Sequence, residues 1–163
     1  MLRFEIGNRQ IYITRTVADI FFQYRQLEQM QDERGGIVLG QITENAQQIL
    51  VSRASIPSNK DMHKRYSFKR SRNWAQEIVQ YEFHNSGGRN TYLGEWHTHP
   101  SRQATPSAQD LRMIKEQFAV NDIRTDLLLL FIVAWEELFI GLYDGQRMPS
   151  ITTGDFSTAN RSL

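Results

Sequence analysis

Short apolar runs rich in β-branched and aromatic residues recur along the chain and predict a protein built largely from strands. The predicted strands cover residues 3–6, 11–14, 36–42, 48–56, 92–97, 127–134 and 138–143. Gly7-Asn8 and the polar stretch 44–47 are typical of turns, so the first four strands are expected to form two hairpins. The unbroken apolar run 127–134 indicates a strand that is buried on both faces.

Three other segments carry apolar residues at helical spacing. The first is expected to begin after an N-cap at Thr16, with Asp19 at the capping-box position, and to continue to about Met30. Its apolar face consists of Val17, Ile20, Phe21, Tyr24 and Leu27. Such a stripe is typical of a helix packed on a sheet rather than of a binding face.

The second predicted helix starts at Ser71 and ends in the Gly-, Asn- and Ser-rich stretch 85–90. Its inward residues are expected to be Trp74, Ile78, Tyr81 and Phe83. The third helix covers about residues 107–118, with Thr105 as N-cap and Pro106 at the first helical position, where the missing N–H of proline is tolerated.

The resulting order β-β-α-β-β-α-β-α-β-β lacks the regular alternation of a parallel fold. Because hairpins imply antiparallel pairs, we predict the α/β class in its mixed α+β form, with one mixed sheet flanked by helices. One domain is expected over residues 1–143. A polar C-terminal tail, 144–163, should be partly ordered at most, with Ile151 and Phe156 as the residues that would dock.

Composition narrows the functional classes. A net charge of +1 gives no global reason to expect nucleic acid or a membrane surface as partner. The absence of cysteine excludes disulfides, a cysteine-based zinc site and a thiol nucleophile. The first residues lack the apolar core of a signal peptide, and the longest apolar run is far shorter than a membrane span. We therefore expect a cytoplasmic protein.

One stretch departs from the even balance of charge. Residues 56–72 show no clean hydrophobic period, and their only acid is Asp61. The basic residues in this stretch are Lys60, Lys64, Arg65, Lys69, Arg70 and Arg72. Two interpretations remain open, a solvated loop and an insertion that contacts the substrate.

Candidate chemistry gathers around one strand and the helix that follows it. His97 and His99 alternate along an extended chain at the end of the predicted strand, so both imidazoles point to one side. Ser107 and Asp110 are three residues apart on the third helix and share a face. Two imidazoles and a carboxylate form a typical set of ligands for catalytic zinc, with a fourth position left open. Glu95 is a candidate general base on the same side of the strand, or equally a structural residue.

Other residues are assigned structural roles. His63 and His84 have no partner at ligand spacing. Trp96 faces away from His97 on the strand and is expected in the core. The chain contains no His-Glu-x-x-His helix and no Gly-rich phosphate loop.

The spacing His97-x-His99, seven residues, Ser107-x-x-Asp110 resembles the JAMM motif of the JAB/MPN metalloprotease superfamily. The resemblance implies that His97, His99 and Asp110 hold one zinc ion. It also implies that Ser107 stabilises the tetrahedral intermediate of peptide-bond cleavage.

A second segment carries the same resemblance. Glu33-Arg34-Gly35-Gly36-Ile37-Val38-Leu39-Gly40 is similar to the Glu-x-Gly-Gly-x-Leu-x-Gly segment of the superfamily, with Val38 where leucine is commoner. The resemblance implies that Glu33 is the general base and acid. The residues alone do not distinguish Glu33 from the adjacent Asp32.

The resemblance further implies a curved mixed sheet flanked by helices, in the cytidine-deaminase-like JAB/MPN architecture. Catalytically intact members cleave isopeptide or peptide bonds after the C-terminal glycine tail of ubiquitin or a ubiquitin-like protein. Direct attack by metal-bound water is expected. The short chain is most similar to small stand-alone bacterial members, particularly the deconjugating proteases of CBASS antiphage operons, and a CBASS nucleotidyltransferase would then be the conjugated target.

Two alternatives remain open. One is a protease that trims sulfur-carrier precursors to expose their diglycine end. The other is a non-catalytic MPN interaction module, against which the intact set of motif residues argues. The sequence does not predict the oligomeric state.

Overall fold

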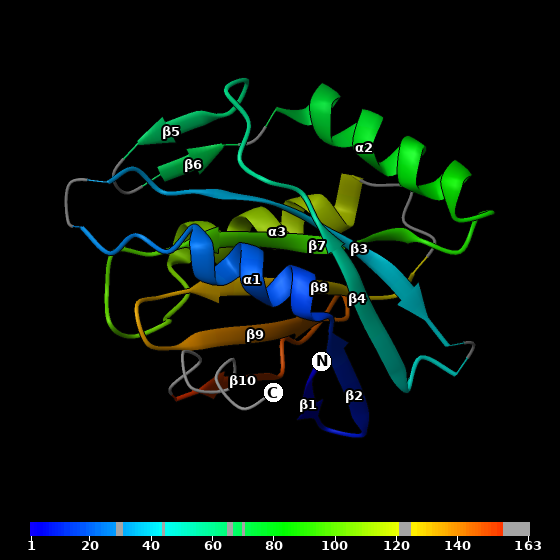
Figure 1. The fold of residues 1–163 in the computed structure, drawn as a ribbon. Helices are drawn as coiled ribbons and strands as arrows, with labels where there is room; N and C mark the ends of the chain where they lie inside the picture. The colour runs from blue at the N-terminus through cyan, green and yellow to red at the C-terminus, as the bar shows by residue number, and fades with distance from the viewer. Residues whose placement is uncertain (29–30, 44, 65–66, 70, 121–124, 155–163) are drawn as a thin grey trace.

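One mixed sheet of eight strands runs through the described part of the protein in its computed structural model (Figure 1). The structure describes residues 1–28, 31–43, 45–64, 67–69, 71–120 and 125–154. From edge to edge the strands are β1 (Leu2–Ile6), β2 (Arg9–Ile13), β4 (Gln48–Ala54), β3 (Gly35–Ile42), β7 (Thr91–Thr98), β8 (Leu128–Val133), β9 (Leu138–Tyr143) and β10 (Ser150–Thr153).

Strand directions confirm the predicted mixed sheet. β1–β2 and β3–β4 are antiparallel hairpins, as their turn residues indicated. β2–β4 and β7–β8 are parallel pairs. Because parallel neighbours need a long crossover, β7 and β8 are joined through α3 (Ala108–Val120). The other helices are α1 (Arg15–Gln23), after β2, and α2 (Arg72–Asn85), before β7.

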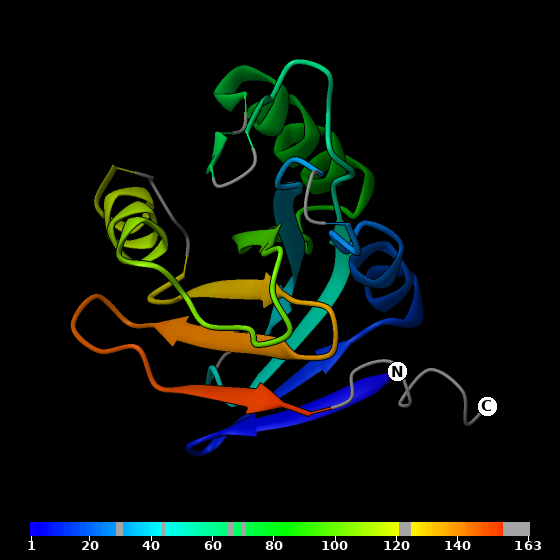
Figure 2. The same cartoon turned by 90° about the vertical axis from the view of Figure 1, so that its left-hand side faces the viewer.

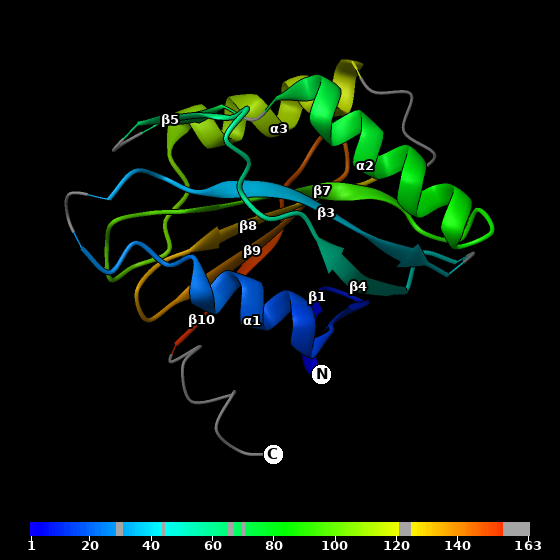
Figure 3. The ribbon, with the colours of Figure 1, turned by 45° about the horizontal axis from the view of Figure 1, so that its top comes forward.

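The helices divide between the two faces of the sheet. α1 lies on one face, where the ring of Phe21 packs against Trp96 and Phe131 at centroid distances of 5.2 and 5.3 Å. α2 and α3 cover the other face through clusters that contain Ala75 and Ile114. Figure 2 shows α1 and α3 on opposite sides of the sheet, and Figure 3 shows α2 and α3 both above it.

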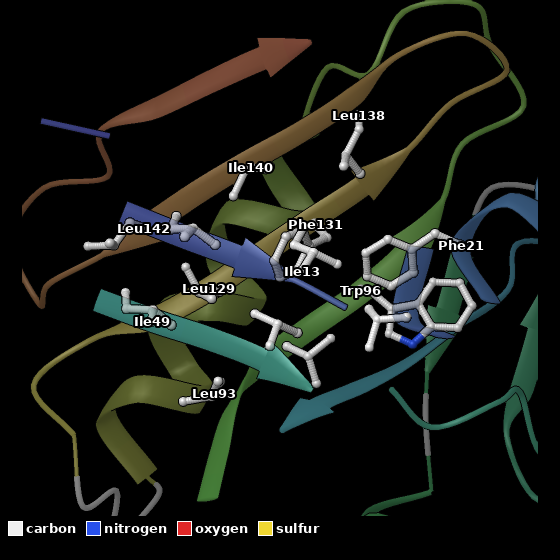
Figure 4. Packing of buried hydrophobic residues seen from close by; sticks show 14 of the residues in the cluster. Ile13, Phe21, Ile49, Leu93, Trp96, Leu129, Phe131, Leu138, Ile140 and Leu142 are labelled. Atoms are coloured by element: carbon white, nitrogen blue, oxygen red, sulfur yellow. The ribbon is translucent and has the colours of Figure 1, made fainter. Parts of the chain in front are cut away.

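Strand β8 separates two hydrophobic clusters and confirms the predicted burial on both faces. Leu129 joins the cluster under α1, whereas Leu128 joins the cluster under α3. The cluster under α1 also unites the opening hairpin with the later strands, because Ile13 and Leu142 both belong to it (Figure 4). The sheet is therefore curved, as the resemblance implied. Trp96 lies fully buried in this core, as predicted.

The first helix differs from the prediction at both ends. It begins at Arg15 with Thr14 as N-cap rather than Thr16, because the first helical hydrogen bond runs from Ala18 N to Thr14 O. It ends at Gln23, well before Met30, which lies outside the described residues. Beyond the helix Leu27 is 59% exposed and Gln26 is 1% exposed, the reverse of the predicted stripe.

Helix α2 begins as predicted, but its buried face differs. The Ser71 Oγ caps the helix by accepting a hydrogen bond from Trp74 N at 3.5 Å. Trp74 and Tyr81 were expected to point inward, yet they are 36% and 68% exposed. Smaller side chains face the sheet instead. The residues packed there are Ala75, Ile78 and Val79.

The basic stretch 56–72 contains regular structure that the sequence did not reveal. β5 (Met62–Lys64) and β6 (Ser67–Lys69) form a small antiparallel sheet of their own, here called the basic hairpin. Each strand has only three residues, which is too short to show an alternation of apolar and polar positions. Arg65, Arg70 and the side chain of His63 lie outside the described residues.

The sheet continues beyond residue 143. β10 pairs antiparallel with β9, and Ile151 packs against the cluster under α1. Phe156 lies outside the described residues. Within the described ranges, no helix combines the length and the apolar character that a membrane crossing requires.

Candidate metal centre

Strand β7 carries His97, leads directly into His99, and is held on both sides. His97 lies opposite Gly35 of β3 and beside Ile132 of β8. His99 follows the end of the strand, where its N–H donates to Val133 O at 3.0 Å. Gly36 lets β3 approach Ser55, the residue that follows β4, because a Cβ at Gly36 would lie 2.3 Å from Ser55 Oγ. His97 therefore stands on a central strand of the sheet, and His99 directly follows it.

A bulge changes the alternation earlier in β7. Val38 of β3 pairs with Gly94, but the next residue, Leu39, pairs with Tyr92, so the register shifts by one residue. Gly94 has a φ of 147°. A Cβ at Gly94 would lie 1.9 Å from Leu129 O, so only glycine fits. The bulge brings Tyr92 and Glu95 together, and the Tyr92 hydroxyl donates to Glu95 Oε1 at 2.6 Å. Glu95 is thus a buried partner of Tyr92.

Helix α3 supplies the carboxylate through a reciprocal capping arrangement. Ser107 lies immediately before the helix, whereas the sequence predicted it within the first turn. Thr105, the predicted N-cap, and Pro106 come before Ser107 and lie outside the helix. The Ser107 Oγ accepts a hydrogen bond from Asp110 N at 3.2 Å, while Ser107 N donates to Asp110 Oδ2 at 2.5 Å. These two bonds form a capping box and fix the Asp110 side chain at the start of the helix.

The three motif side chains with metal-binding atoms converge, and we call them the ligand group: His97, His99 and Asp110. Their ligand atoms all lie within 4.8 Å of one another. His97 Nε2 is 3.0 Å from Asp110 Oδ1, and His99 Nε2 is 3.2 Å from Asp110 Oδ2. Ligand atoms around a tetrahedral zinc ion are about 3.3 Å apart, given bond lengths of roughly 2.0 Å. The group therefore fits a small divalent cation.

One buried atom in the ligand group supports this fit. His97 Nε2 is buried and finds no hydrogen-bond partner among the described residues, although a carboxylate oxygen lies close by. A buried polar atom without a hydrogen bond is costly, and an imidazole nitrogen in this position is suited to metal coordination.

Charge in the ligand group also favours a cation. Burial raises the pKa of the Asp110 carboxyl, but the imidazoles of His97 and His99 and the hydrogen bond from Ser107 N outweigh burial and hold that pKa well below its usual range. Burial lowers the pKa of His99, yet its contact with Asp110 outweighs burial and the net pKa is raised. Asp110 is thus an ionised acceptor, the form that binds metal.

Glu33 reaches the same site from the segment before β3. It is 8% exposed, whereas the neighbouring Asp32 is exposed, so the structure separates the two acids that the sequence left equivalent. Burial raises the pKa of Glu33, the nearby His97 and His99 counteract it, and Asp110 adds to the rise. Glu33 N donates to Lys64 O at 3.0 Å, which ties this segment to the basic hairpin.

Two polar pairs near the site were not found by sequence reasoning. Besides Tyr92 and Glu95, the Thr98 hydroxyl donates to Gln26 Oε1 at 2.8 Å. The local sequence carried no signal for the second pair, because Gln26 lies off the predicted apolar face of the first helix. His84, expected to be structural, is exposed on α2 and lies outside the ligand group.

Comparison with known proteins places the chain among its relatives. It is 30% identical over 131 residues to a CD-NTase/cGAS isopeptidase of Vibrio cholerae, covering 80% of each chain. It is 30% identical over 141 residues to a protein of the same name from Pseudomonas aeruginosa, covering 86% of this chain and 87% of the relative. A probable metalloprotease of Sinorhizobium fredii is 31% identical over 84 residues, 51% of each chain. Residues 21–142 match the family model described as prokaryotic homologs of the JAB domain. The chain therefore belongs to the prokaryotic JAB family, as the motif residues had indicated.

Proposed function

We propose that this protein is a zinc-dependent isopeptidase that cleaves the bond after the C-terminal glycine tail of a ubiquitin-like protein. The observation that carries the proposal is the convergence of the ligand group, His97, His99 and Asp110, beside the buried carboxyl of Glu33. Relatives named isopeptidase and probable metalloprotease support the same reaction class.

The ligand group would hold the metal. Two imidazoles and one carboxylate favour zinc and leave one coordination position for exchange with solvent or substrate. A zinc ion in such a site supplies a water molecule whose pKa is lowered to about 7 and a Lewis acid for a carbonyl oxygen.

The remaining chemistry belongs to two side chains. Glu33 accepts a proton from the attacking water and delivers it to the leaving amine nitrogen as the C–N bond breaks. Its burial and raised pKa suit a group that must both take and return a proton. Ser107 accepts from Asp110 N, so its own O–H is left to donate to the oxyanion that develops on the scissile carbonyl.

The names of the relatives favour a conjugate over a precursor as substrate. Three of them carry the name CD-NTase/cGAS isopeptidase. We therefore propose a ubiquitin-like protein joined to an enzyme of the CD-NTase type as the natural substrate. Incubation with such a conjugate and with a tail-extended precursor, each with and without a zinc chelator, tests the proposal. Chelator-sensitive release from the conjugate is expected, and cleavage confined to the precursor would instead identify a processing protease.

Ser107→Ala is expected to lower kcat by about 100-fold, because a lost oxyanion donor typically costs 10²- to 10³-fold. The substitution also removes the N-cap of α3. Ser107→Gly is the matched variant, since glycine caps a helix nearly as well as serine but has no hydroxyl. Steady-state kinetics and thermal unfolding of both variants separate the two roles. Wild-type kcat in the glycine variant would contradict the assignment.

The basic hairpin is a candidate contact surface for the substrate. It joins the Glu33 segment through Lys64 O, and Met62 on it is 60% exposed. Lys60, just before it, lies over the ring of Trp74 at 4.7 Å. Cations at such a surface would speed its encounter with a partner of complementary charge.

Replacing Lys60 and Lys64 by Glu together is expected to raise KM about tenfold at low salt and to leave kcat nearly unchanged, because the charges act on encounter rather than on the chemical step. The control variant reverses Arg3 and Arg15, two exposed cations outside the hairpin. Kinetics at two ionic strengths provide the measurement. Equal KM values for both variants would reduce the hairpin to a solvated surface element.

A further inference from the structure

A buried polar network connects the histidine strand with the segment that carries Glu33. Its centre is Thr98, which is 0% exposed and lies between the two histidines of the ligand group. Because side chains alternate along β7, Thr98 faces away from His97 and His99. Its partner Gln26 is 1% exposed. Two fully buried polar side chains outside the ligand group call for a physical explanation.

The contacts of Thr98 hold the residue that follows Glu33. Arg34 N donates to Thr98 Oγ1 at 2.9 Å, and Thr98 N donates to Arg34 O at 2.8 Å. Both backbone groups of Arg34 are therefore bound to one residue of β7. This pair of bonds fixes the distance between the Glu33 segment and the histidine strand.

The contacts of Gln26 hold the other side of the same segment. Gln26 Nε2 donates to Gln31 O at 2.8 Å, and Gln26 Oε1 accepts the Thr98 hydroxyl at 2.8 Å. The backbone of Gln26 is itself anchored, since Trp135 Nε1 donates to Gln26 O. The side-chain amide of Gln26 therefore links Gln31, which precedes Glu33, to the Thr98 hydroxyl. That hydroxyl in turn holds Arg34, which follows Glu33.

From this geometry we propose that Gln26 and Thr98 are positioning residues, which hold the Glu33 carboxyl against the ligand group. The inference rests on the proposed role of Glu33 in proton transfer. Neither side chain touches the reacting atoms. Their hydrogen bonds instead set the position of residues 31–34, and a shift of about 1 Å in a catalytic group can cost 10²-fold in rate.

Three substitutions test the network. Thr98→Val removes the hydroxyl and keeps the shape, Thr98→Ser restores the hydroxyl, and Gln26→Met removes the amide and leaves β7 unchanged. Thr98→Val and Gln26→Met are expected to lower kcat by about 10- to 100-fold with KM and zinc content unchanged. Thr98→Ser should remain within about threefold of the wild type, because both hydrogen bonds of the hydroxyl are kept.

Amide hydrogen exchange of residues 31–36 in the zinc-free protein supplies a measurement that does not depend on activity. Thr98→Val should speed exchange of the Arg34 amide about tenfold, since that N–H loses its acceptor. The control is Ser52→Ala, because Ser52 Oγ is buried with no partner among the described residues. Unchanged exchange in Thr98→Val, or faster exchange without a fall in kcat, would overturn the proposal.

Failure of the proposed function gives a different result. If the wild-type protein cleaved no conjugate, the proposed role of Glu33 in proton transfer would be wrong, whatever the rates of amide hydrogen exchange are. Faster exchange of Arg34 in Thr98→Val would still support the network as the anchor of this segment. Unchanged exchange would still overturn it.

Discussion

Glu33→Gln is expected to abolish detectable cleavage of a ubiquitin-like conjugate while the protein retains its zinc. The amide keeps the shape of the side chain but cannot accept the proton of the attacking water. General acid–base catalysis contributes about 10²- to 10⁴-fold, so kcat should fall by that order. Single-turnover cleavage and metal analysis on the same preparation provide the measurement.

The matched control for this prediction is Asp32→Asn. Asp32 adjoins Glu33 but is exposed, so its substitution should leave kcat within about twofold, as surface changes usually do. If Glu33→Gln and Asp32→Asn were equally active, Glu33 would not be the base. A zinc-loaded, inactive Glu33→Gln protein should also retain bound conjugate and allow its target to be identified.

Asp110→Asn is expected to lose zinc and, with it, all activity. The substitution removes the charge of the ligand group but keeps an oxygen that can accept the hydrogen bond from Ser107 N. Helix α3 should therefore still begin at the same residue. Zinc content is expected to fall from about one ion per chain to a small fraction, and added zinc should no longer raise Tm.

His84→Ala serves as the control for the metal prediction, because His84 is an exposed histidine outside the ligand group. It should keep the zinc content of the wild type. His97→Ala should behave like Asp110→Asn. Stoichiometric zinc in both ligand variants would show that the metal is bound elsewhere.

The ligand group could be predicted from the sequence because local rules define it. Alternation along a strand places His97 and His99 together, and helical spacing relates Ser107 to Asp110. The strands and the two-sided burial of β8 followed from equally local patterns. Glu33 was different, since only the resemblance to a known family singled it out from Asp32. Burial in the folded chain separates them, and burial is a property of tertiary structure.

The parts that the sequence did not predict depend on contacts between distant residues. The bulge at Gly94 pairs Tyr92 with Glu95, yet a glycine in a strand does not by itself reveal a register shift. Helix α1 ends at Gln23, and beyond its end Gln26 is buried against Thr98, which lies 72 residues away in the chain. Local periodicity contains no information about such a partner.

The capping box of α3 has a consequence for the conformational entropy of metal binding. A free aspartate must give up its side-chain rotamers when it coordinates an ion, and immobilising a side chain costs on the order of 0.5 kcal/mol or more. In this fold Asp110 has already lost that freedom, because Ser107 N holds its Oδ2 at the first turn of the helix. Folding of the helix start therefore also fixes the carboxylate that we propose as a metal ligand, and selection for a stable helix start maintains it in that position.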